Sequence, residues 1–338
     1  MMLKTTEKII DRYIEEALLE NIAIRIGRNK TVLAEVYRSK KGTIDSTTLF
    51  DMASVTKILS VTMLALMAMD RGRLSMEDKV SLFFDYEGPL TIKHLLTHTM
   101  GIGHKNLCVD GMTYDHIGEH ILSIPPDIAV GSDVQYSCPA FILMGKILEK
   151  LYGKRLDVLF DELIAKPLDM SRSSFLPIAG KSKFINSNIK KEDLGKVNDY
   201  NCRFLGGVAG NAGIFSCVDD LSKFIAMLSA QGAPLISKKT WQAATQNHTP
   251  GMSESRGLGF LYVDKRYPQT GELFAEGSIG HCGHTGQSIF LDPKTGLYVI
   301  LLSDATLSTV KKYGKENYEQ VIKMRREIHN AIKKDLSL

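Results

Sequence analysis

The chain lacks the features that mark secreted, membrane-spanning or nucleic-acid-binding proteins. Its 42 Lys and Arg residues against 38 Asp and Glu leave a net charge of only +4, too small to indicate a nucleic-acid partner. The five cysteines are an odd number without regular spacing, which favours reduced thiols over a disulfide framework. Segment 1–21 carries acidic residues throughout and no uninterrupted apolar stretch, so it does not resemble a secretory signal.

Long hydrophobic runs are also missing. The most apolar stretch, 58–69, is too short to span a bilayer and is interrupted by Ser60 and Thr62. We therefore expect a cytoplasmic protein with neither a membrane nor a nucleic acid as partner. No phosphate loop, dinucleotide fingerprint or Gly-x-Ser-x-Gly elbow occurs, so no cofactor is expected.

What the chain does have is strand patterning near both ends and helical patterning between them. The predicted elements are an amphipathic helix within 1–21, strands at 23–26, 32–37, 258–263, 288–291 and 297–302, helical patterning that includes 140–148, and an amphipathic helix at 316–334. This order predicts an α+β fold: an antiparallel sheet built from both ends of the chain, flanked by the terminal helices, with an inserted, mainly helical subdomain.

The domain boundaries follow from the same pattern. We expect a single domain over 1–338, in which 1–60 and 230–338 form the α/β part and 61–229 the helical part. The sequence does not indicate an oligomeric state.

Ser54 and Lys57 stand three residues apart where the chain becomes apolar and helical. Residues at i and i+3 share a helix face, so the Lys57 amine can reach the Ser54 hydroxyl. A serine hydroxyl becomes a good nucleophile when a neighbouring base takes its proton, and a lysine of lowered pKa supplies such a base. A Ser-x-x-Lys spacing also occurs by chance in many proteins, so the pair acquires weight only from its context.

That context is a series of five further segments in a fixed order. They are 91–101, Tyr136-Ser137-Cys138, 166–170, the glycine-rich 206–216, and Gly283-His284-Thr285-Gly286. Together with 50–57, they resemble the serine β-lactamase and penicillin-binding-protein superfamily, in particular its class C β-lactamase-related branch. The branch includes esterases and D-amino-acid peptidases. The resemblance implies the β-lactamase/transpeptidase-like fold and acyl-enzyme chemistry without a metal.

The resemblance also implies roles for individual residues. Ser54 would be the nucleophile, Lys57 its proton partner, and Tyr136 a second general acid/base, acting as a phenolate or a proton shuttle. His284 stands where the family more often has lysine, and would polarise the site or hold a substrate carboxylate. Lys57 and His284 together would supply the cations that a working tyrosine needs.

The substrate-binding edge is assigned in the same way. The backbone N–H groups of Ser54 and Gln287 would form the oxyanion hole, with Gly286 and Thr285 beside them. Cys138 occupies a position where the family usually has Asn, which binds the lysine and a substrate amide. A thiol is a weak hydrogen-bonding group, so the substitution favours an ester or a small peptide as substrate over a β-lactam.

Three alternatives stay open. One is weak β-lactamase or penicillin-binding activity, and another is a ligand-binding homologue that has lost turnover. The third is a zinc site, because 116–120 matches the His-x-x-Glu-His pattern, although Gly118 weakens the helix that such a site requires. We expect no metal.

Overall fold

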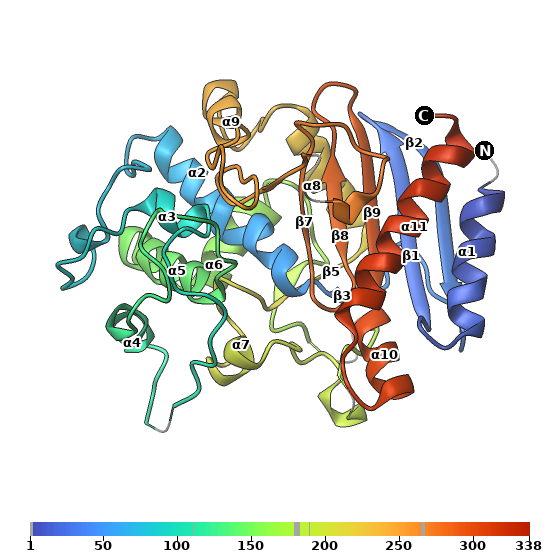
Figure 1. Cartoon of the computed structure of the whole chain (residues 1–338), viewed down its shortest axis with the longest axis horizontal. Helices are drawn as coiled ribbons and strands as arrows, with labels where there is room; N and C mark the ends of the chain where they lie inside the picture. The colour runs from blue at the N-terminus through green and yellow to red at the C-terminus, as the bar shows by residue number, and fades with distance from the viewer. Residues whose placement is uncertain (1–2, 110, 179–182, 189, 265–267) are drawn as a thin grey trace.

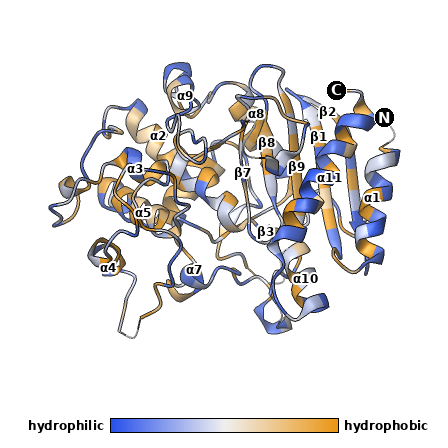
Figure 2. Ribbon diagram, viewed as in Figure 1, coloured by the Kyte–Doolittle hydropathy of each residue, from blue (hydrophilic) through white to orange (hydrophobic). Residues whose placement is uncertain are grey.

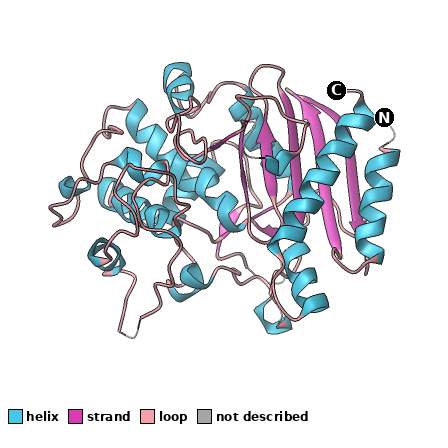
Figure 3. Cartoon of the chain, in the orientation of Figure 1, coloured by secondary structure: helices cyan, strands magenta, loops and turns pink. Residues whose placement is uncertain are grey.

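A six-stranded antiparallel sheet forms one side of the molecule and a group of helices the other (Figures 1 and 3). The computed structural model describes residues 3–109, 111–178, 183–188, 190–264 and 268–338. The strands lie in the spatial order β2 (Thr31–Ser39), β1 (Asn21–Arg28), β9 (Leu297–Ser303), β8 (Ser288–Leu291), β7 (Ile279–Cys282) and β6 (Leu261–Tyr262). The predicted sheet built from both ends of the chain is therefore confirmed.

Each face of the sheet packs into a separate core, because successive side chains of a strand point to opposite faces. On β1, Ile22 and Ile24 face the core beneath the terminal helices, α1 (Lys4–Glu15) and α11 (Tyr318–Leu336). Ala23, between them, faces the second core, which the sheet shares with the helical region. Figure 1 shows α1 and α11 side by side over the sheet, with both chain ends nearby.

The remaining helices are mostly short. They are α2 (Met63–Asp70), α3 (Ile92–Leu96), α4 (Ile117–Ser123), α5 (Cys138–Tyr152), α6 (Leu156–Phe160), α7 (Tyr200–Phe204), α8 (Val218–Ser229), α9 (Lys238–Ala244) and α10 (Ala305–Tyr313), with 3-10 turns at Val80–Leu82, Lys191–Asp193 and Pro268–Thr270 and a π-helical turn at Asp161–Ala165. The ribbons of α2 and α5 carry much hydrophobic colouring (Figure 2), and their buried apolar residues belong to the larger hydrophobic core.

The stretch Ala53–Asp70 is long and apolar enough to cross a membrane by length and composition, but 83% of it is buried within the protein. It is the central helical segment of the larger core.

Helix α8 packs on the sheet rather than among the other helices. It contacts β1, β8 and β9, and the Arg25 guanidinium of β1 donates to Asp219 (2.8 Å) and Ser222 (2.7 Å) on this helix. Helix α8, which lies within the predicted helical part 61–229, is thus attached to the sheet, and the subdomain boundaries stay a prediction.

A second, three-stranded sheet lies between the two parts. It consists of β3 (Phe50–Asp51), β5 (Ile214–Ser216) and β4 (Ser174–Phe175), with β5 in the middle. Strand β3 ends just before Ser54, so this small sheet joins the nucleophile segment to the chain that follows the glycine-rich segment 206–213.

The glycine-rich segment packs directly on α5. A Cβ atom on Gly210 would lie 1.9 Å from the carbonyl oxygen of Phe141, a distance that requires the backbone to move. On the helix side, a Cβ atom on Gly145 would lie 3.3 Å from the Cα of Gly210, which a small adjustment can relieve. The backbone of the glycine-rich segment thus lies closer to the backbone of α5 than any side chain at position 210 would permit.

We expect Gly210→Ala to lower the free energy of unfolding by about 3 kcal/mol or more, because the new methyl group overlaps a backbone carbonyl. Gly145→Ala is the matched control. Its tighter contact is offset by a gain in helix propensity of about 1 kcal/mol, so we expect a change close to zero. Urea denaturation of both variants measures the difference. Equal stability of the two would contradict the close packing.

Candidate active site

Ser54 and Lys57 are brought together by a tight turn at the start of the central helical segment. Residues Ala53–Val55 form a 3-10 turn, and Ile58–Thr62 continue as a π-helical turn into α2. In a 3-10 turn, residues i and i+3 eclipse one another, which is the spacing of this pair. The Lys57 Nζ lies 2.9 Å from the Ser54 Oγ, so the predicted contact is present.

The residue before Ser54 has a left-handed backbone conformation. Ala53 has a φ of +44°, which is costly for a residue with a Cβ atom and is maintained only by its surroundings. The Asp51 carboxylate accepts a hydrogen bond from the Ala53 N–H at 2.8 Å and holds this turn in place. Asp51 is therefore a positioning residue for the nucleophile.

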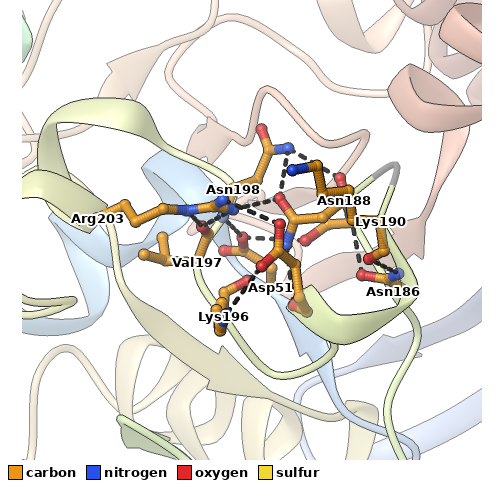
Figure 4. A network of polar contacts seen from close by, with 10 residues as sticks. Asp51, Asn186, Asn188, Lys190, Lys196, Val197, Asn198 and Arg203 are labelled. Carbon is orange, nitrogen blue, oxygen red and sulfur yellow. Dashed lines mark hydrogen bonds and ion pairs between the residues drawn. The ribbon is translucent and has the colours of Figure 1, made fainter.

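The Asp51 carboxylate also anchors a loop from the far side of the site. It accepts hydrogen bonds from the Asn198 N–H (2.6 Å) and the Ser187 hydroxyl (3.2 Å). Figure 4 shows Asp51 within the polar network of this loop, which includes Asn188 and Arg203. Burial raises the pKa of Asp51 to about 6, although the hydrogen bonds from Ala53, Ser187 and Asn198 each lower it. The carboxyl group is therefore mainly ionised at neutral pH.

Lys57 is completely buried among a hydroxyl, a backbone carbonyl and a thiol. Its Nζ donates to the carbonyl oxygen of Asn211 at 3.0 Å, lies 3.6 Å from the Cys138 Sγ, and contacts the Ser54 Oγ. None of these three partners is a carboxylate. Burial lowers the pKa of Lys57, because a charged ammonium loses its hydration there. A neutral amine that can accept the Ser54 proton is thus within reach.

Tyr136 completes a hydrogen-bonded triad. Its hydroxyl donates to the Ser54 Oγ at 2.7 Å, and 36% of the residue is exposed. Desolvation of the phenol and the neighbouring Cys138 sulfur raise the pKa of Tyr136 well above its ordinary range. The resting tyrosine is therefore a neutral phenol, which favours proton donation over the phenolate alternative.

A buried histidine fixes the position of Tyr136. His98 has a φ of +57°, and its ring packs on the Tyr136 ring with centroids 4.6 Å apart. Its Nδ1 accepts from the Ser137 N–H at 3.0 Å, and its carbonyl accepts from the Gln135 N–H at 2.8 Å. His98 thus accepts hydrogen bonds from the backbone on both sides of Tyr136, which is a structural role rather than a catalytic one.

The cations that face Tyr136 are Lys57 and an arginine that the sequence did not single out. The Arg256 guanidinium carbon lies 5.7 Å from the Tyr136 ring centroid, against 5.1 Å for the Lys57 Nζ. Arg256 is 2% exposed and paired with Glu254. Its fixed positive charge lowers the pKa of Lys57 and opposes the rise in the pKa of Tyr136.

His284 belongs to the segment Gly283-His284-Thr285-Gly286, called the third motif from here on, and has a partner of its own. Its Nε2 is 3.1 Å from the Glu316 carboxylate, and its ring stacks on Tyr318 with centroids 5.3 Å apart. The His284 side chain is 42% exposed. The Nε2 of His284, to which the resemblance assigns a substrate carboxylate, is therefore already paired with a carboxylate of the protein.

The turn that carries the third motif is attached to the nucleophile turn through Asp51. The Gln287 side-chain amide donates to the Asp51 carbonyl oxygen at 2.7 Å, and the Thr285 hydroxyl lies 3.1 Å from the same oxygen. Thr285 is 2% exposed, so its side chain serves this attachment. The assignment of the Ser54 and Gln287 N–H groups to an oxyanion hole, with Gly286 beside them, stays a prediction.

A second arginine, which the sequence analysis did not predict, also contacts the turn of the third motif. Arg325 of α11 is fully buried and donates to the carbonyl oxygen of Gly283 at 2.8 Å. It also donates to the Gln269 side chain. The sequence signal for this role is an arginine on the apolar face of the C-terminal helix, between Met324 and Ile328.

The His-x-x-Glu-His match does not form a metal cluster. Helix α4 begins at Ile117, and the His116 ring is engaged with the Thr113 hydroxyl at 2.8 Å. Within the described ranges, no group of three or more His, Cys, Asp or Glu side chains is arranged to hold a metal ion.

Because Lys57 is buried without a carboxylate partner, its replacement should separate reactivity from stability. We expect Lys57→Met to slow phosphonylation of Ser54 by a fluorophosphonate about 10²–10⁴-fold, the usual contribution of a general base. The free energy of unfolding should stay the same or rise, because Met fills the space without the cost of a buried charge. Intact-mass kinetics and urea denaturation measure the two effects.

Lys146→Met is the matched control, since Lys146 is also largely buried but pairs with Glu149 at 2.8 Å. Its loss leaves a carboxylate unpaired, so the control should lose stability and keep Ser54 reactivity. A Lys57→Met variant that reacts at the wild-type rate would show that Lys57 is not the base.

Comparisons with known proteins identify the family of the chain. The family model described as Beta-lactamase matches residues 8–320. Among curated proteins, the chain is 26% identical to N-acetylmuramyl-L-alanine amidase of Bacillus subtilis (strain 168), over 76% of this chain and 68% of the relative. It is also 26% identical to esterase EstB of Burkholderia gladioli, over 88% of this chain and 89% of the relative.

Among solved structures, EstCE1, described as a hydrolase with promiscuous acyltransferase activity, superposes with a TM-score of 0.75 at 18% identity and covers 97% of both chains. This likeness shows the fold. The family model spans nearly the whole chain, and the segments that it spans include all three residues of the hydrogen-bonded triad. The protein belongs to the beta-lactamase family.

Proposed function

We propose that the protein is a serine hydrolase that cleaves carboxylic esters through an acyl-enzyme on Ser54. The observation that carries the proposal is the triad itself: a serine hydroxyl within 2.9 Å of a buried lysine amine and 2.7 Å of a tyrosine hydroxyl. The nucleophile is thus in contact with both a base and an acid, which is the arrangement that acyl transfer requires.

In the proposed acylation step, the Ser54 Oγ forms a bond to the substrate acyl carbon while its proton passes to the neutral Lys57 Nζ. The bond to the leaving alkoxide then breaks, and the alkoxide takes the proton of the Tyr136 hydroxyl and departs as an alcohol. The Lys57 ammonium returns a proton to the Tyr136 phenolate. In deacylation, water is the nucleophile. A water molecule loses a proton to Lys57 and adds to the acyl carbon, and Ser54 then leaves with the Lys57 proton.

Two features favour an ester over a D-amino-acid peptide. Cys138 offers only a weak acceptor where a substrate amide would need a partner, and an ester has no N–H group to satisfy. The Glu316 carboxylate lies against His284 and repels the terminal carboxylate of a peptide. Esterase EstB, among the proteins compared above, supports the same direction.

The nucleophile is tested by intact-mass spectrometry after exposure to a fluorophosphonate. We expect one adduct on the wild-type protein and none on Ser54→Ala, with the label mapped to the peptide that contains Ser54. An equal adduct on Ser54→Ala would refute the assignment.

The substrate class is tested with p-nitrophenyl esters, a D-Ala-D-Ala peptide and a chromogenic cephalosporin. We expect hydrolysis of the esters, and no such turnover by Ser54→Ala. Faster turnover of the peptide or the cephalosporin than of every ester would replace the proposal with the corresponding activity. A folded protein that turns over none of them, yet is stabilised by one of them against heat, would be a binding homologue.

The charge of Glu316 should govern discrimination against carboxylate-bearing substrates. We expect Glu316→Gln to raise kcat/KM for a p-nitrophenyl hemisuccinate about fivefold relative to p-nitrophenyl butyrate, which is neutral. The reason is that the repulsion between two unit charges in water at close contact is about 1 kcal/mol. Glu319→Gln, which removes a nearby exposed charge at the start of α11, should leave the ratio unchanged. An unchanged ratio in Glu316→Gln would remove Glu316 from substrate selection.

A further inference from the structure

A buried ion pair lies beside the Tyr136 ring. The guanidinium of Arg256 donates through Nε (2.9 Å) and through Nη2 to one oxygen of the Glu254 carboxylate. Arg256 is 2% exposed, and the Glu254 side chain is 14% exposed. A buried ion pair gains little stability over an apolar pair of the same size, because both charges lose their hydration. Stability alone therefore does not account for the pair in this place.

The loop that carries Arg256 is fixed in relation to Tyr136. The Arg256 N–H donates to the buried Thr249 hydroxyl at 2.9 Å. Ser253, in the same loop, donates from its N–H to the Asp133 carboxylate at 2.7 Å, three residues before Tyr136 in the chain. The position of the guanidinium beside the phenol ring is therefore maintained by direct contacts of the loop.

The positive member of the ion pair makes the contact with the ring. The Arg256 Cζ lies 5.7 Å from the centroid of the Tyr136 ring. The Glu254 carboxylate is bound to Nε and Nη2, whereas Nη1 is buried with no hydrogen-bond partner among the residues described. The positive charge is thus screened by an anion on one side of the guanidinium only. At this range a buried cation stabilises a negative charge on the ring much more than it would in water.

Arg256 takes the place that the sequence analysis gave to His284. The His284 Nε2 is 3.1 Å from the Glu316 carboxylate, whereas the Lys57 Nζ and the Arg256 Cζ lie 5.1 Å and 5.7 Å from the Tyr136 ring centroid. The two cations at the ring differ in kind. The lysine amine gains and loses a proton in each acyl transfer, but a guanidinium stays charged throughout.

We propose that Arg256 is the permanent cation that stabilises the Tyr136 phenolate formed during departure of the leaving group, and that it thereby enables cleavage of esters of unactivated alcohols. The inference rests on the proposed acyl-transfer function and deepens it by naming the class of leaving group. Arg256 forms no bond and exchanges no proton, so it is a positioning residue that acts through Tyr136.

The step on which Arg256 acts is the breaking of the ester bond. The bond between the acyl carbon and the alkoxide oxygen breaks, and the proton of the Tyr136 Oη moves to that oxygen. The negative charge then stays on the Tyr136 Oη until the Lys57 ammonium returns a proton. Arg256 lowers the energy of the state in which Tyr136 carries this charge.

The benefit of this cation depends on the alcohol that leaves. p-Nitrophenolate departs as a stable anion and needs little help from an acid, whereas ethoxide is a strong base that departs only as it takes a proton. Stabilisation of the phenolate therefore accelerates cleavage of an ethyl ester and has little effect on a p-nitrophenyl ester. A purely structural role of Arg256 would change the two rates in parallel.

The experiment measures kcat/KM for p-nitrophenyl, phenyl and ethyl butyrate in wild type, Arg256→Lys, Glu254→Gln and the double variant Arg256→Met with Glu254→Gln. The double variant removes both charges, so it leaves no unpaired ion in the interior and should fold. We expect its kcat/KM for ethyl butyrate to fall about tenfold relative to that for p-nitrophenyl butyrate, with phenyl butyrate between them. Arg256→Lys keeps a cation and should retain most of the wild-type ratio.

The two partners of the ion pair should have effects of opposite sign. Glu254→Gln removes the anion and keeps the cation, so we expect it to raise the ratio of the ethyl to the p-nitrophenyl rate constant about threefold. If the pair served only to hold the loop, its loss would lower all three rate constants together. An unchanged ratio in the double variant, or a lowered ratio in Glu254→Gln, overturns the proposal.

Arg325 provides the matched control. It is also a buried arginine next to an aromatic ring, but its Cζ lies 5.6 Å from the Tyr318 ring centroid, and it donates to the carbonyl oxygen of Gly283. Arg325→Gln should slow the hydrolysis of all three butyrates by a common factor, because it loosens the turn of the third motif. A change of the ratio as large as that in the double variant would show that the ratio reports general damage to the site, and would overturn the proposal.

A second measurement needs no turnover. Phosphonylation of Ser54 is followed by intact mass with two phosphonate esters that differ only in their leaving group, p-nitrophenol or phenol. The double variant should slow the reaction of the phenyl compound more than that of the p-nitrophenyl compound, and equal slowing would disprove the role of Arg256. Selective slowing in a protein that hydrolyses none of the butyrates would retain that role and refute the proposed function instead, so the two failures are distinguishable.

Discussion

One buried carboxylate joins the parts of this site. Asp51 is 1% exposed, and its side chain holds both the left-handed turn at Ala53 and the loop at Ser187 and Asn198. Its carbonyl oxygen binds the third motif through Gln287. The nucleophile turn, one wall of the site and the third motif therefore share a single residue as their anchor. Movement of any one of them disturbs the other two.

The site lowers the stability of the fold because Lys57 and Asp51 are buried without an oppositely charged side chain in contact. Lys57 contacts a hydroxyl, a backbone carbonyl and a thiol but no carboxylate, and Asp51 has neutral donors. In both groups burial shifts the pKa toward the uncharged form, downward for Lys57 and upward for Asp51. Such groups reduce stability, and the apolar core around the central helical segment offsets that cost. The strain at Ala53 and His98 belongs to the same class of functional cost.

The sequence predicted the features that depend on local periodicity. The periodic spacing of apolar residues predicted the hairpin of β1 and β2, strands β8 and β9, and the two terminal helices. The Ser54–Lys57 contact follows from an i, i+3 spacing. The two-residue strands of the small sheet are too short to show a period. The roles of Arg256 and Glu316 arise from contacts between distant segments, for which a single sequence has no local signal. The left-handed Ala53 was equally invisible, since alanine is typical of helices.

The order of the strands constrains how a growing chain can complete this fold. Strand β1 pairs along one edge with β2, its immediate neighbour in sequence, but along the other edge with β9, where Ile24 lies opposite Leu301. During synthesis the hairpin of β1 and β2 therefore emerges well before β9, and the backbone N–H and C=O groups along the other edge of β1 have no strand partner until nearly the whole chain has left the ribosome. The triad residues Ser54, Lys57 and Tyr136 all emerge before the strand that closes the sheet. A ribosome-bound chain thus carries the chemical groups of the site for some time before the sheet that supports its third motif exists.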